Sequence, residues 1–128
     1  MPNYSHDHVH LASPAPLKTA EFYESRFNAK RLAMTTLPDG RTSITLDLNG
    51  ARIMIVERRA QAPSVPPGTG IGLDHFGIKT DDIEATVAEL KANGVKFRDE
   101  IRQPSPGIKI AFFWAPDDVL IELLERSV

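Results

Sequence analysis

The chain has 128 residues, a hydrophobic share of 41% and a formal net charge of -2, values typical of one soluble globular domain. This charge argues against nucleic-acid binding, and no apolar run approaches the roughly 20 residues needed to span a bilayer. Because the first residues do not read as a signal peptide, we expect a cytoplasmic protein. The absence of cysteine restricts any metal site to nitrogen and oxygen ligands.

The chain opens with the pattern of a strand followed by a helix. Residues 6–11 alternate in polarity, so the expected strand places three imidazoles on one face, those of His6, His8 and His10. A Pro-rich start and apolar residues at helical spacing predict a helix over residues 16–27. Asn28, a residue that tolerates the left-handed conformation, ends it.

Three further strands complete the first half. Turn signals at residues 38–40 and at Asn49-Gly50, the commonest two-residue hairpin turn, separate them. The expected strands cover residues 30–37, 42–48 and 51–57.

The second half repeats this order. Asp7-His8-Val9-His10-Leu11 returns, 67 positions later, as Asp74-His75-Phe76-Gly77-Ile78. Thr80-Asp81-Asp82 then caps a helix that ends at Asn93-Gly94. Turns at residues 104–107 and 116–118 bound the remaining strands, expected at 95–97, 109–114 and 119–124.

The stretch between the halves is rich in Pro and Gly and has no apolar period, so it reads as a connector. A half of roughly 60 residues is marginal as an independent domain. We therefore expect a single domain in which module one covers about residues 1–58, the linker about 59–71 and module two about 72–128.

Three residues suggest a metal site. His8 and His75 are equivalent in the repeat and can face each other across an internal pseudo-twofold axis. Glu122 lies in an apolar strand, where an unpaired carboxylate would be costly. Its counterpart in module one, 68 positions earlier, is Met54, a poor ligand for hard ions. Two imidazoles and one carboxylate would leave open positions for a substrate.

Ordinary interpretations compete with this one. Either histidine alone is more often a hydrogen-bonded residue than a ligand, and Glu122 can be a strand-edge glutamate that reaches solvent. His10, which shares the face of His8, is a candidate proton-transfer group, although a histidine run near a terminus can simply be solvated.

These motifs resemble the vicinal oxygen chelate superfamily, which includes glyoxalase I, methylmalonyl-CoA epimerase, extradiol dioxygenases and bleomycin-binding proteins. The resemblance covers nearly the whole chain and rests on Asp7-His8-Val9 with Phe22-Tyr23, on Asp74 to Ile78, on the helix and glycine turn from Asp81 to Val95, and on the strands Lys109 to Phe112 and Leu120 to Leu124.

The resemblance implies an α+β fold in which two βαβββ modules, related by a pseudo-twofold repeat, form a curved mixed sheet with helices on its outer face. It makes His8, His75 and Glu122 metal ligands. The family's other ligand position, Glu in glyoxalase I and Gln in some epimerases, falls on Met54. Catalytic roles are expected for Glu122 and His10.

The function expected is that of a metal-dependent lyase or isomerase whose small substrate chelates the metal through adjacent oxygens. The cofactor would be Zn, Fe, Mn, Ni or Co. An extradiol-type ring-cleaving dioxygenase and a metal-free drug-binding protein are the alternatives. The expected partners are a small-molecule substrate and a second copy of the chain, within a homodimer, and neither nucleic acid nor a membrane. Whether the two histidines meet within one chain or across two stays open.

Overall fold

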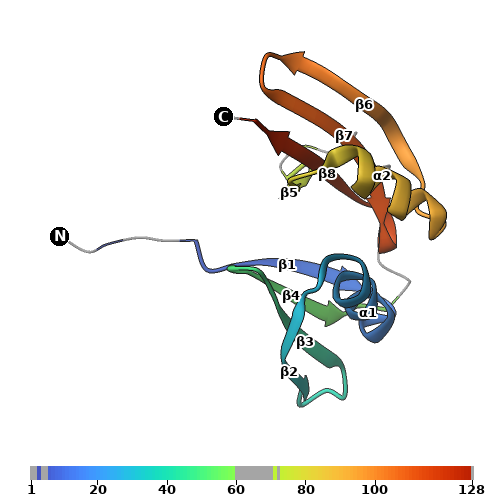
Figure 1. Cartoon of the computed structure of the whole chain (residues 1–128). Coiled ribbons are helices and arrows are strands. Elements are labelled where there is room, and N and C mark those ends of the chain that lie inside the picture. The colour runs from blue at the N-terminus through green and yellow to red at the C-terminus, as the bar shows by residue number, and fades with distance from the viewer. Residues whose placement is uncertain (1–2, 4–5, 60–70, 72, 128) are drawn as a thin grey trace. The chain divides into compact units, whose positions relative to one another are not determined.

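The computed structural model describes Asn3, residues 6–59, Ile71 and residues 73–127 (Figure 1). The chain divides into two compact units, Met1–Pro63 and Ser64–Val128, which we call module one and module two. Each has the element order strand, helix, strand, strand, strand, so the predicted α+β fold with two βαβββ modules is confirmed. Most of the predicted linker, residues 59–71, lies outside the described residues.

Module one forms a four-stranded sheet in the order β1-β4-β3-β2, in which β1 runs parallel to β4 and the other pairs are antiparallel. The predicted helix and the third and fourth strands have the expected bounds. The first strand does not begin at His6; it begins at His8 and continues to Ser13, because its pairing with β4 starts there. The elements are β1 (His8–Ser13), α1 (Pro16–Phe27), β2 (Lys30–Thr36), β3 (Thr42–Leu48) and β4 (Ala51–Glu57).

Module two repeats this topology with the strand order β5-β8-β7-β6. The strand expected at residues 95–97 is instead the nine-residue β6, which includes Pro104. Proline is tolerated there because β6 is an edge strand with irregular pairing. The elements are β5 (Phe76–Lys79), α2 (Ile83–Ala92), β6 (Phe97–Ser105), β7 (Ile108–Ala115), the 3-10 turn η1 (Pro116–Asp118) and β8 (Val119–Arg126).

Backbone angles support the alignment of the two modules. Asn49 and Gly50, between β3 and β4, have φ values of 51° and 104°; Asp117 and Asp118, between β7 and β8, have φ values of 64° and 58°. Two successive positive φ angles are typical of tight hairpin turns. These dipeptides are 68 positions apart, the same offset as Met54 and Glu122, so the alignment of the two modules includes their last turn.

In each sheet, one face packs against the module's helix. Ser13 on β1 bonds Thr19 of α1, and Glu125 on β8 accepts from the backbone N–H of Ile83 in α2, so odd-numbered residues of these two strands face the helices. The odd-numbered residues supply much of the core, including Leu11, Ile53, Ile55, Ile121 and Leu123.

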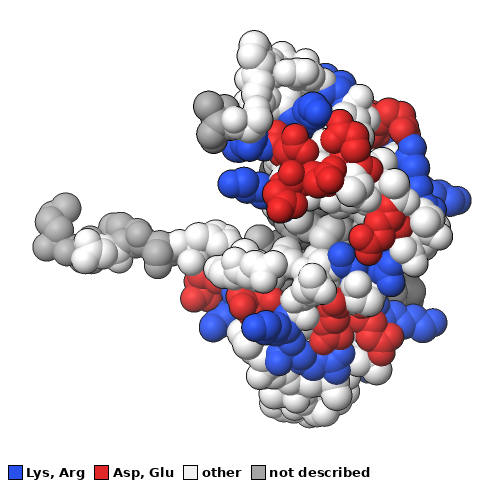
Figure 2. All heavy atoms as spheres, viewed as in Figure 1, with Lys and Arg blue, Asp and Glu red and all other residues white. Residues whose placement is uncertain are grey.

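Even-numbered residues of β1, β4 and β8 point to the opposite side of each sheet, which we call the open face. It carries His8, His10 and Met54 in module one and Glu122 in module two. Acidic and basic side chains lie beside one another on the surface of both modules (Figure 2). Neither described helix is long and apolar enough to cross a membrane.

Candidate metal centre

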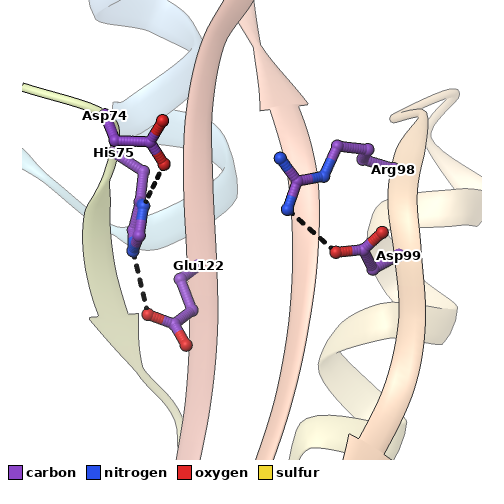
Figure 3. A network of polar contacts seen from close by, with 5 residues as sticks. All are labelled: Asp74, His75, Arg98, Asp99 and Glu122. Atoms are coloured by element: carbon purple, nitrogen blue, oxygen red, sulfur yellow. Dashed lines mark hydrogen bonds and ion pairs between the residues drawn. The ribbon is translucent and has the colours of Figure 1, made fainter. Parts of the chain in front are cut away.

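Module two brings together two of the predicted ligands. His75 directly precedes β5 and Glu122 lies on β8; these strands are parallel neighbours in which Gly77 pairs with Glu122. The Nε2 atom of His75 lies 3.1 Å from Oε1 of Glu122 (Figure 3). Side-chain exposures of 30% for His75 and 19% for Glu122 make the pair half-buried yet accessible to a small molecule.

Asp74 orients the imidazole of His75. Its Oδ2 lies 2.8 Å from Nδ1 of His75, and because an ionised carboxylate only accepts, Nδ1 carries the proton. In the neutral ring, Nε2 then presents a lone pair to the Glu122 carboxylate. Two acceptors facing each other require a proton or a cation between them. This carboxylate-histidine arrangement is the one that fixes metal-binding histidines in proteins.

The distance between the two atoms fits a shared metal ion. Ligand atoms bound at roughly 2.0–2.2 Å, at angles between octahedral and tetrahedral, lie about 2.8–3.6 Å apart. The separation of 3.1 Å falls in this range. Imidazole nitrogen and carboxylate oxygen suit several divalent transition metals. His75 and Glu122 therefore fit the divalent metal ion that the sequence predicts.

Module one repeats the oriented histidine. His8 Nδ1 lies 2.8 Å from Asp7 Oδ2, and this hydrogen bond is the main reason why the pKa of Asp7 is lowered. That His8 shares one metal site with His75 and Glu122 stays a prediction. The two aspartates are functional candidates that the sequence interpretation missed, although the repeated Asp-His dipeptide contained the signal.

Strand register settles which residue of module one corresponds to Glu122. Met54 pairs with His10, two residues after His8, as Glu122 pairs with Gly77, two residues after His75. The carboxylate of module two is therefore matched by a thioether in module one. His10 lies beside Met54 on the open face, with an exposed side chain.

Apolar side chains surround Glu122 on the open face of module two. Phe112 pairs with Glu122 across the sheet, and its ring meets the His75 ring edge-on at a centroid distance of 5.1 Å. Ile110 and Leu120 form a buried cluster with Phe112, against which Trp114 packs. Such surroundings strengthen electrostatic interactions of the His75-Glu122 pair. The adjacent Phe113 instead lies fully buried in the core.

A second group of carboxylates, Asp82, Glu84 and Glu125, lies at the start of α2. Asp82 accepts from the backbone N–H of Ala85, and Glu125 from that of Ile83. Lys109 bonds Glu84 at 2.9 Å and thereby lowers the pKa of that carboxyl. These contacts give the group a structural role in capping the helix.

The described residues thus form a two-module α+β fold with an accessible imidazole-carboxylate pair. Comparison with known protein families identifies the class of protein to which this fold belongs. Residues 5–123 match the model of the Glyoxalase/Bleomycin resistance protein/Dioxygenase superfamily. The chain belongs to this superfamily, as the sequence motifs indicated.

Two curated relatives come from Arabidopsis thaliana. A lactoylglutathione lyase is 29% identical over 116 residues, which are 86% of this chain and 40% of the relative. A probable chloroplastic lactoylglutathione lyase is 48% identical over 62 residues, which are 45% of this chain and 17% of the relative. The chain thus spans less than half the length of either protein.

Solved structures share the fold over almost the whole chain. A glyoxalase family protein from Enterococcus faecalis has 26% identity and a TM-score of 0.80, with 94% of this chain and 97% of that chain covered. The fosfomycin resistance protein of Listeria monocytogenes has 18% identity and a TM-score of 0.77, with coverages of 99% and 97%. A mutant of that Listeria protein was crystallised with Mn(II) and a dihydroxypropylphosphonic acid; it has 20% identity and a TM-score of 0.74, with coverages of 95% and 92%.

Proposed function

We propose that this protein is a divalent-metal-dependent lyase or isomerase that acts on a small substrate with two adjacent oxygen atoms. The metal ligands are His75 and Glu122 of module two and His8 of module one. The observation that carries the proposal is the 3.1 Å contact between His75 Nε2 and Glu122 Oε1, with the far nitrogen of the ring held by Asp74.

Each residue of this site has a defined task. Asp74 and Asp7 keep the protons on Nδ1 of the two histidines, so that both Nε2 atoms are free to bind metal. A bound divalent ion supplies Lewis-acid polarisation of the substrate oxygens. Phe112 and its apolar neighbours exclude water from one side of the pair.

His10 is the proposed proton-transfer residue. It shares a strand face with His8, is exposed, and lies beside Met54, where the module-two pattern would place a carboxylate. An imidazole can both accept and donate a proton. In this assignment, His10 provides the acid-base group that Met54 lacks.

The curated relatives support the choice of a lyase. The Arabidopsis lactoylglutathione lyase matches 86% of this chain. Because this chain spans 40% of that relative, its substrate and full reaction belong to the proposal and not to the family assignment.

A ring-cleaving dioxygenase is the second candidate, and one observation favours it. Because Met54 occupies the position in module one that corresponds to Glu122, the proposed donor set is two imidazoles and one carboxylate. This is the facial triad used by non-haem iron oxygenases.

Metal binding by single-site variants tests the proposed site. Wild-type protein should bind a stoichiometric divalent metal in elemental analysis and titration calorimetry. His75→Ala, Glu122→Gln and His8→Ala should lower the affinity at least about 100-fold, since each removes one protein ligand. The matched control is His6→Ala, because His6 is exposed and precedes β1. Unchanged metal content in His75→Ala and Glu122→Gln would exclude the site.

Activity assays distinguish the two reactions. If it is a lyase, metal-loaded protein should interconvert S-lactoylglutathione and the hemithioacetal of methylglyoxal and glutathione equally well with and without oxygen. Turnover of catechols that stops under anaerobic conditions would instead support the dioxygenase.

A further inference from the structure

The open face of module two carries a cation beyond the metal site. Arg98 reaches from β6 across β7 on the side of the sheet where His75 and Glu122 lie (Figure 3). Its Cζ atom lies 4.7 Å from the centroid of the Phe112 ring. A guanidinium at this distance over an aromatic face is held by cation-π attraction and stacking.

A β-bulge gives Arg98 this direction. Phe97 pairs with Phe113 and Asp99 with Phe112, so Arg98 is an extra residue opposite one pair of β7. Bulges redirect side chains and are common near functional sites. Here the bulge brings the side chains of both Arg98 and Asp99 to the open face (Figure 3).

Phe112 joins Arg98 to the metal site. The His75 ring lies 5.1 Å and the Arg98 Cζ atom 4.7 Å from the same Phe112 centroid, so imidazole and guanidinium are at most about 10 Å apart. The open face therefore presents metal-ligating atoms and a cation that both lie against the Phe112 ring, which is itself only 7% exposed. A small molecule of six to eight carbon atoms spans such a length.

Most hydrogen-bond donors of Arg98 are available. Nη2 donates to Asp99 at 2.9 Å, whereas the guanidinium has five N–H donors in all. The side chains of Arg98 and Asp99 are 39% and 34% exposed, and such exposed pairs contribute little stability. Asp99 thus orients the guanidinium without occupying it.

The arginine near the start of β2 in module one is bound differently. Arg31 donates through both Nε and Nη2 to the Glu24 carboxylate of α1, each at 2.8 Å. This bidentate pair ties β2 to the helix and occupies the planar fork of the guanidinium. Arg98, by contrast, makes a single hydrogen bond to a side chain, which leaves its other donors available for recognition of a ligand.

We propose that Arg98 binds a carboxylate at the end of the substrate remote from its metal-chelating oxygens. This inference rests on the proposed function and narrows it to substrates that are acidic at one end and chelating at the other. Arg98 is a specificity-determining residue in this assignment.

Two hydroxamic acids of equal chain length test the proposal. Hexanohydroxamic acid chelates metals through adjacent oxygens and has no charge at its other end; the monohydroxamate of adipic acid adds a carboxylate there. In calorimetry on metal-loaded wild-type protein, the acid should bind about 10-fold more tightly, as a charge-assisted hydrogen bond provides. In Arg98→Met this preference should vanish, with the affinity for hexanohydroxamate unchanged.

Arg26→Met, an equal change of charge on α1, is the control and should keep the preference. An undiminished preference in Arg98→Met, or none in the wild type, overturns the role of Arg98. If the Arg98 proposal fails in this way but hexanohydroxamate binds wild-type protein and not His75→Ala, the proposed metal site is still supported. If neither compound binds the wild type, the metal site and the Arg98 proposal both fail.

Discussion

The two modules have the same scaffold and differ in chemistry. Each joins the end of its first strand to its helix by a pair of hydroxyls, Ser13 with Thr19 at 2.9 Å and Thr80 with Thr86 at 2.7 Å. Each also contains an aspartate that holds the following histidine. The repeat thus includes the aspartate that orients each histidine proposed as a metal ligand.

The modules differ at the position of the proposed ligand Glu122, which is occupied by an apolar residue in module one. Glu122 lies beside His75 in module two, and Met54 occupies the corresponding place in module one. A similar difference is found at the helices: Asp82 caps α2 through its side chain, whereas Ala15 provides no side-chain cap for α1. The repeated scaffold is therefore compatible with different side chains at corresponding positions.

The largest effect is expected from equivalent core residues. Ile53 and Ile121 are 2% and 0% exposed, and each change to Ala should cost about 2–5 kcal/mol of the free energy of unfolding, because it leaves a cavity. Urea-induced unfolding measures this. In a single domain, both variants shift one common transition; two transitions, of which each variant shifts one, would contradict the single-domain prediction. Leu32→Ala, at a position that is 52% exposed, is the control and should change the stability by less than about 0.5 kcal/mol.

Variants of the two aspartates test whether both oriented histidines contribute to metal binding. Asp74→Asn and Asp7→Asn should each weaken metal binding about 10- to 100-fold, because the amide no longer fixes the imidazole tautomer. Calorimetric titration with Zn²⁺ gives the affinities. A loss only in Asp74→Asn would show that module one does not contribute a ligand.

Replacing Met54 by glutamate, the residue at the corresponding position of module two, tests directly how this difference affects metal binding. Met54→Glu should raise metal affinity about 10-fold, equivalent to about 1.4 kcal/mol, since it adds a carboxylate on the face of His8. Met34→Glu, on the exposed strand β2, adds the same charge away from this face. An equal affinity in both variants would argue against a metal near Met54.

The smallest effect concerns the helix caps. Asp82→Ala removes the bond from Ala85 N–H and makes the start of α2 resemble that of α1, so it should cost about 1 kcal/mol. Thermal unfolding measures the change against Asp81→Ala, an exposed neighbour outside the cap. Equal losses in the two variants would show that charge near the helix, and not the cap bond, is responsible.

The sequence predicted what depends on local pattern. Period-2 alternation, turn dipeptides and helix signals predicted both helices and the order of helices and strands along the chain, and the repeat predicted the match of Met54 with Glu122. The exception was β6, expected to end at Phe97 and found to reach Ser105. The sequence of β6 conceals an edge strand because it contains a proline and several charged residues, and its pairing partner β7 is visible only in the fold.

The candidate site divides in the same way. The repeated Asp-His dipeptide and a carboxylate in an apolar strand identified His8, His75 and Glu122 as candidates, because burying a charge without a partner is costly. Tertiary structure decided that His75 and Glu122 meet at 3.1 Å, since this contact depends on the parallel register of β5 and β8, strands far apart in the chain. It also decided that Arg98 turns toward their face, because the bulge in β6 exists only through pairing with β7.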